Sequence, residues 1–126
     1  MIVLDTSALI DSLSGPKRSA SRLRAFIEKE ERVLLPALVL YEWLRGPRLP
    51  EEITAQEALF PSQSVIVSGS REAALSAQLY RSLPRPRGRE IDIAIAACAI
   101  VRGAELWTLN PSDFNDIRQL RLSATS

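Results

Sequence analysis

Short apolar segments alternate with helical patterns along most of this chain, and this alternation restricts the folds that it can adopt. Aliphatic residues bounded by polar or turn residues predict strands at 2–5, 32–36, 64–68, 105–110 and, with a weaker pattern, 119–123. Apolar residues at helical spacing, broken by Gly and Pro, predict helices at 6–13, 17–31, 36–45, 51–59, 70–83 and 90–102. Strands alternating with helices are typical of a parallel sheet covered on both faces. We therefore expect an α/β fold.

Size and hydropathy patterning indicate one domain outside the membrane. The chain has 126 residues, which fits a single domain over 1–126. Its longest apolar runs have nine residues, whereas a bilayer-spanning helix needs about 20. The first residues lack a basic flank, and Asp5 and Asp11 would interrupt a secretory core. We therefore expect a cytoplasmic protein without a membrane segment.

The composition excludes several classes of catalytic site. The chain contains no histidine and one cysteine, Cys98. Histidine-based acid–base catalysis, Ser-His-Asp and Cys-His sites, zinc sites with His ligands and Cys-rich zinc clusters are therefore excluded. The net charge of +1 gives no strong indication of a partner. Any catalysis would have to use carboxylates, hydroxyls, Arg or Lys, or a metal held by oxygen.

Asp92 is the acidic residue least compatible with its surroundings. It is the only charged residue between Ile91 and Val101, in a segment apolar on nearly all sides, as a buried helix is. An isolated buried carboxylate costs several kcal/mol unless it is paired or bound to a metal. The alternative is a partly hydrated Asp in the first turn, favoured by the helix dipole.

Three further acids lie at strand ends or among apolar residues, and each also has a simpler explanation. Asp5 follows the first strand and could cap the next helix. Glu42 has apolar neighbours on both sides and could pair with Arg45. Asp113 follows the fourth strand in an Asn-Pro-Ser-Asp sequence that also suits a turn. Most other glutamates, Glu52 and Glu72 among them, are expected on exposed helix faces.

Taken together, Asp5, Glu42, Asp92 and Asp113 predict a metal site. Ligands of parallel α/β sheets gather outside the carboxyl ends of the strands, and no shared buried base is evident in the sequence. Because converging carboxylates repel one another, a cation would stabilise them. Oxygen ligands favour Mg²⁺ or Mn²⁺. Such a site suits hydrolysis at phosphorus by a metal-activated water.

The segments "MIVLDTSALI", "LVLYEWLRG" and "REIDIAIAACAIVRGAELWTLNPSDF" resemble PIN-domain proteins, specifically toxin ribonucleases of the VapC type. The resemblance implies an α/β/α sandwich with a central, mainly parallel sheet of four to five strands. It also implies a Mg²⁺- or Mn²⁺-dependent endoribonuclease that cleaves single-stranded or structured RNA. Such proteins are usually dimers silenced by a cognate antitoxin. The resemblance assigns the acidic quartet to Asp5, Glu42, Asp92 and Asp113, and auxiliary polar roles to Thr6 or Ser7 and to Asn110.

The segment "RSLPRPRGRE" places Arg85, Arg87 and Arg89 directly before the predicted Asp92 helix. These arginines could contact RNA phosphates or an acidic antitoxin segment, or the segment could be a solvated loop stiffened by proline. Trp43 and Trp107 lie in apolar surroundings and are expected in the core.

Two other functions remain open from the sequence. One is a Mg²⁺-dependent phosphoester hydrolase, although Ser7 stands where aspartyl-phosphate enzymes often carry a second Asp. The other is a non-catalytic RNA- or protein-binding member of the same fold.

Overall fold

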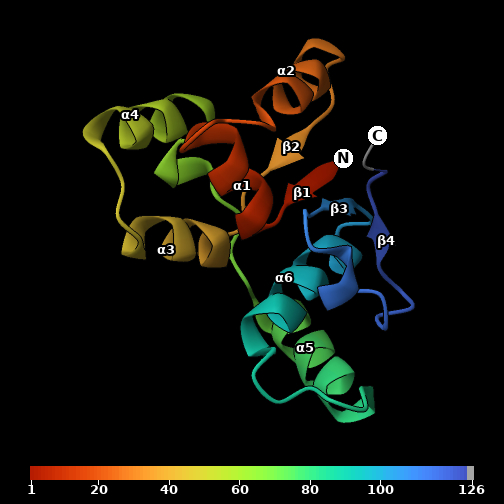
Figure 1. Cartoon of the computed structure of the whole chain (residues 1–126). Coiled ribbons are helices and arrows are strands. Elements are labelled where there is room, and N and C mark those ends of the chain that lie inside the picture. The colour runs from red at the N-terminus through yellow and green to blue at the C-terminus, as the bar shows by residue number, and fades with distance from the viewer. Residues whose placement is uncertain (125–126) are drawn as a thin grey trace.

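The computed structural model describes residues 1–124, and residues 125–126 of the expected domain lie outside this range. Within the described range (Figure 1), the elements in chain order are β1 (Ile2–Leu4), α1 (Thr6–Leu13), α2 (Ala20–Glu28), β2 (Val33–Leu34), α3 (Ala37–Arg45), α4 (Pro50–Leu59), η1 (Ser62–Ser64), α5 (Ser70–Ser82), α6 (Glu90–Val101), β3 (Glu105–Trp107), η2 (Pro111–Asp113) and β4 (Arg121–Leu122).

The four strands of residues 1–124 form one parallel sheet in the order β2-β1-β3-β4. Helices α5 and α6 pack together, and α6 contacts β1 and β3. Helix α1 packs against α2, α3 and α4, which form the other helical layer (Figure 1). The expected α/β/α sandwich with a parallel sheet of four to five strands is confirmed. Because the strands are parallel, their carboxyl ends meet at one edge of the sheet.

The core lies where the sheet meets α1, α3 and α6. Strand β1 is buried along its whole length, and α6 buries six of its twelve residues. Trp43 and Trp107 are fully buried, as expected from their apolar surroundings, and the Phe26 ring meets Trp107 edge to face. Cys98 is also buried and lies 3.4 Å from the Ser68 hydroxyl.

The strands predicted at 32–36, 105–110 and 119–123 are shorter in the structure, and two other predicted elements differ more. Residues 64–68 do not form a strand, because only a single parallel bridge links Ile66 to Pro36. The bridge uses the Leu35 carbonyl oxygen and the Ala37 N–H, and because the chain enters α3 at Ala37, the pairing does not continue. The predicted helix 17–31 is shorter, since α2 covers only Ala20–Glu28. Ile27, which the apolar spacing of this segment predicts on the buried face, is 45% exposed.

Glu52 and Glu72 are buried rather than exposed, contrary to the sequence-based expectation. Each is the third residue of its helix and accepts a hydrogen bond from the backbone N–H just before the helix, at Leu49 and Gly69 respectively. Glu72 also pairs with Arg102 at 2.9 Å. Over residues 1–124, no helix has the length and apolar character needed to cross a bilayer.

Candidate active site

Asp5 stands directly after the buried strand β1, at the carboxyl edge of the sheet. It precedes α1, but its side chain makes no capping hydrogen bond to that helix. Its carboxylate instead accepts hydrogen bonds from the Thr108 hydroxyl at 2.6 Å and the Ser7 hydroxyl at 3.0 Å. Both bonds reach Oδ2, and within residues 1–124 none reaches Oδ1. The residue is 5% exposed, so the network orients a buried carboxylate while Oδ1 is left for another ligand.

The segment that follows β3 completes this network. The Ser7 hydroxyl accepts the backbone N–H of Leu109 at 3.0 Å, and the Thr108 hydroxyl accepts that of Asn110, also at 3.0 Å. Asp5 donates its own backbone N–H to the Trp107 carbonyl oxygen. The ends of β1 and β3 are therefore held together by both backbone and hydroxyl contacts.

Glu42 lies on the partly buried face of α3, which packs against α1. The Thr6 hydroxyl donates a short hydrogen bond to its Oε1. Its Oε2 lies 3.3 Å from Arg45, the local pairing considered from the sequence. Because the Arg45 side chain is 54% exposed, this pair is worth little and can be exchanged for another partner.

Asp92 is the third residue of α6 and is partly buried. Within residues 1–124, no hydrogen bond or ion pair reaches its carboxylate. Burial, followed by the negative charges of Asp5, Asp113 and Glu42, raises the pKa of Asp92 to about 6, and Arg89 opposes this rise. Desolvation and neighbouring like charges both disfavour the ionised form. Asp5, Asp113 and Glu42 therefore lie near enough to Asp92 for their charges to act on it.

Asp113 ends the short helix η2, and its side chain is exposed at the rim of this cluster. The next residue, Phe114, is 1% exposed and fixes the turn in the core. The Asn110 carbonyl oxygen accepts the Asp113 backbone N–H, while the Asn110 side chain is exposed. Asn110 therefore shapes the turn through its backbone.

The donor set fits a hard divalent cation that keeps part of its water shell. No three acidic or cysteine side chains of residues 1–124 lie close enough together to enclose an ion by themselves. Mg²⁺ is usually held by only one or two protein carboxylates, together with waters and substrate phosphates. Asp5, oriented by its hydrogen bonds, and Asp92, which has no partner in residues 1–124, would supply these two carboxylates. Their charges repel each other, and a cation between them would relieve this repulsion. That all four acids hold a metal remains a prediction.

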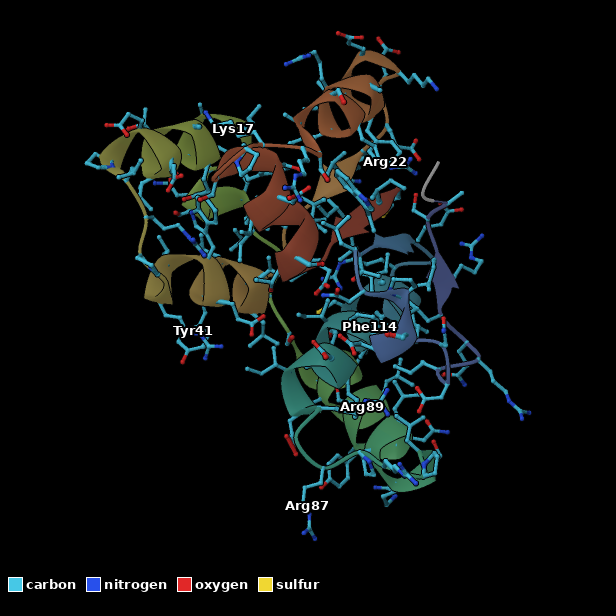
Figure 2. The ribbon with its side chains drawn as sticks, viewed as in Figure 1. Lys17, Arg22, Tyr41, Arg87, Arg89 and Phe114 are labelled. Carbon is cyan, nitrogen blue, oxygen red and sulfur yellow. The ribbon has the colours of Figure 1, made fainter. Side chains whose placement is uncertain are left out.

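The three arginines before α6 differ in their surroundings. Arg85 and Arg87 are exposed, and Figure 2 shows Arg87 pointing away from the body of the protein. Arg89 instead lies beside the segment that carries Phe114 and pairs with Asp116 at 2.7 Å. Their predicted contact with RNA or an antitoxin is not tested by these positions.

Sequence reasoning missed Thr108 as part of the site, and it treated Asp116 only as a weak site candidate, because turn and surface roles explain that residue. Thr108 is 2% exposed and contacts both Asp5 and the turn that leads to Asp113. Its place in the "TLNPSDF" motif, at a strand end opposite Asp5, was an available signal. Asp116 carries no such signal, because its partner Arg89 is 27 residues away in sequence.

Comparisons with known proteins agree with this fold. The PIN domain family model matches residues 2–120. Ribonuclease VapC19 of Mycobacterium tuberculosis is 34% identical over 117 residues, which cover 90% of this chain and 92% of that protein. DNA-bound VapBC from Salmonella typhimurium superposes with a TM-score of 0.80 at 24% identity, over 97% of this chain and 96% of that chain. A toxin–antitoxin complex from Klebsiella pneumoniae gives a TM-score of 0.73 at 24% identity, over 95% of each chain. The chain therefore belongs to the PIN domain family, as a relative of the VapC ribonucleases.

Proposed function

We propose that this protein is a Mg²⁺- or Mn²⁺-dependent endoribonuclease that cleaves single-stranded or structured RNA as the toxin of a toxin–antitoxin pair. The observation that carries the proposal is Asp92, a carboxylate without a partner in residues 1–124 whose pKa is raised by burial and by three other acids. Structural acids are normally paired or solvated. An acid kept among like charges is typical of a functional site.

The chain's own residues would prepare this site for a cation and a phosphodiester. Thr108 and Ser7 hold Asp5 in one orientation, and Thr6 does the same for Glu42. Asp5 and Asp92 would be the main ligands, with Glu42 and Asp113 adding negative charge or water contacts. A divalent cation bound there supplies the positive charge that stabilises in-line attack of water on phosphorus. Without it, the acids would repel the RNA backbone.

The partners follow from the same proposal. The exposed Arg85 and Arg87 are suited to RNA phosphates, which are recognised largely through Arg and Lys. The structurally similar proteins include toxin–antitoxin complexes, and this supports a cognate antitoxin as the partner of this chain. We further propose that it works in the cytoplasm and as a homodimer.

Cleavage of labelled single-stranded RNA by the purified, partner-free chain tests the proposal. We expect cleavage with Mn²⁺ or Mg²⁺ and none with excess chelator. Asp5→Asn and Asp92→Asn should each remove most activity, whereas Glu28→Gln, an exposed acid on α2, should leave it unchanged. Hydrolysis of a small phosphomonoester without RNA cleavage would favour the phosphoester hydrolase. RNA binding without any cleavage would favour a non-catalytic binding protein.

A further inference from the structure

Arg89 makes an unusual number of contacts for a residue on a surface loop. It directly precedes α6, three positions before Asp92, and its side chain is 21% exposed. Its Nη1 and Nη2 donate to the two carboxylate oxygens of Asp116 at 2.8 and 2.7 Å. Two parallel N–H···O bonds of this kind fix orientation as well as distance.

The same guanidinium also donates hydrogen bonds to two backbone carbonyl oxygens, one in the loop before α6 and one at the end of η2. Nη2 donates to the carbonyl oxygen of Asp113 at 3.0 Å, and Nη1 donates to that of Arg85 at 3.2 Å. One side chain thus joins the loop before α6, the end of η2 and the residue Asp116 beyond it. Figure 2 shows Arg89 between the start of α6 and the segment that carries Phe114.

These contacts link the two acids that regular secondary structure does not hold together. Asp92 is on α6, whereas Asp113 ends the single helical turn η2. The Asp113 side chain is exposed. Phe114 fixes the turn to the core on one side. Arg89 fixes it on the other side, through the Asp113 carbonyl oxygen itself.

We propose that Arg89, held by Asp116, is a positioning residue that fixes the Asp113 turn against the start of α6 and so sets the spacing between Asp113 and Asp92 for a divalent cation. This inference rests on the proposed metal site. It assigns Arg89 a role different from phosphate contact, because both terminal nitrogens are already engaged within the chain. Arg85 and Arg87 remain the loop's candidates for RNA.

If Arg89 acts only through its charge, or if it positions the Asp113 turn, the metal affinity should change in opposite directions when Arg89 is replaced by Gln. A positive charge near the acids repels a cation, so its loss in Arg89→Gln would tighten metal binding if charge were its only effect. If Arg89 positions the turn, the same variant should bind metal more weakly. Arg89→Lys keeps the charge but cannot form the bidentate contact. Positioning therefore predicts weaker binding for Lys as well, whereas charge alone predicts no change.

A Mn²⁺ titration of the full chain measures the Mn²⁺ dissociation constant without relying on cleavage. Free Mn²⁺ is detected by its electron paramagnetic resonance signal. We expect the Mn²⁺ dissociation constant to rise about tenfold in Arg89→Gln, the lower end of the usual effect when a residue that supports a metal site from outside its ligand shell is replaced. A smaller rise is expected for Arg89→Lys. Arg118→Gln removes an exposed charge from the same segment and should leave the constant within about twofold. Far-ultraviolet circular dichroism would confirm that each variant is folded.

The failure of this inference differs from the failure of the proposed function. If Arg89→Gln binds Mn²⁺ as well as or better than wild type, Arg89 does not position the site, although the metal site stands. The same holds if RNA binding falls while the Mn²⁺ dissociation constant is unchanged, since Arg89 would then be a phosphate contact. If wild type binds no Mn²⁺, both the metal site and the role of Arg89 are overturned. If Arg89→Gln does not fold, Arg89→Lys and Asp116→Asn decide, and unchanged Mn²⁺ binding in both overturns the proposal.

Discussion

Replacing Asp92 with Asn should stabilise the metal-free protein while abolishing its activity. Asn has nearly the shape of Asp but no charge, and within residues 1–124 the Asp92 carboxylate has no hydrogen bond to lose. Its ionised form is disfavoured by burial and by the charges of Asp5, Asp113 and Glu42. The substitution therefore removes an unfavourable interaction and leaves the packing intact.

The size of the effect follows from the pKa of Asp92. The pKa of the Asp92 carboxyl is about 6 in the folded protein, whereas an ordinary Asp carboxyl has a pKa of 3.8. Ionising Asp92 in the folded protein at neutral pH therefore costs at most roughly 3 kcal/mol. Partial solvation reduces this, and we expect Asp92→Asn to gain about 1–2 kcal/mol at pH 7.5. For a domain of this size, that is a rise of about 3–8 °C in Tm.

The pH dependence has a definite sign. A carboxyl whose pKa is raised on folding contributes stability below its unfolded pKa and loses that contribution as pH rises through the folded value. Metal-free wild type should therefore lose stability between about pH 4 and 6, relative to Asp92→Asn. The two proteins should differ in Tm at pH 7.5 and converge near pH 4.

Thermal melts with chelator and with Mn²⁺ provide the assay. At a metal concentration of 100 times the dissociation constant, wild type should gain about 2.7 kcal/mol, and the variant much less. Glu28→Gln, on the exposed face of α2, should stay within about 0.5 kcal/mol of wild type under all conditions. A metal-free Asp92→Asn variant that is less stable than wild type, and that responds to Mn²⁺ equally, would refute a shared acidic site.

Two further predictions concern the support of Asp5 and the loop before α6. Thr108→Val removes the hydroxyl that contacts Asp5 and the Asn110 N–H, so it should lower the free energy of unfolding by about 1–3 kcal/mol and reduce cleavage. Thr54→Val, which removes an exposed hydroxyl on α4, should change the free energy of unfolding by less than about 0.5 kcal/mol, and an equal loss in both variants would argue against the network. Replacing Arg85 and Arg87 together with Gln, in the inactive Asp92→Asn background, should reduce the salt dependence of RNA binding by about 1.4 units of log–log slope. Arg24→Gln, an exposed charge on α2, should leave the slope unchanged and serves as the control. If the Arg85 and Arg87 variant also left the slope unchanged, the loop would not contact phosphate.

The strongly patterned elements were predictable because local sequence determines them. Helix α6 is apolar on nearly all sides, and its observed end at Val101 lies one residue from the prediction. The placement of Asp5 at the end of β1 follows from a buried apolar strand that runs directly into a carboxylate. In both cases the unusual position of a charge was visible without tertiary information.

The errors arose where tertiary partners decide the outcome. Residues 64–68 have the β-branched composition of a strand, but their only bridge partner, within residues 1–124, is a proline that opens a helix. Glu52 and Glu72 look like exposed helix residues, yet both turn back to bind the N–H groups that precede their helices. Hydrophobic periodicity does not report which side chains satisfy the ends of a helix.

The arginines before α6 show why a charged sequence cluster is a weak guide to a binding surface. Arg85, Arg87 and Arg89 have the same spacing and the same charge, so sequence alone assigns them one role. The structure separates them, because Arg89 is adjacent to α6 and reaches a carboxylate 27 residues later in the chain, whereas Arg87 points outward (Figure 2). A guanidinium that is already hydrogen-bonded to Asp116 and to the Asp113 carbonyl would have to break those bonds to hold a phosphate. The difference between an RNA contact and a support for the acidic site therefore depends on a long-range pair that only the folded chain reveals.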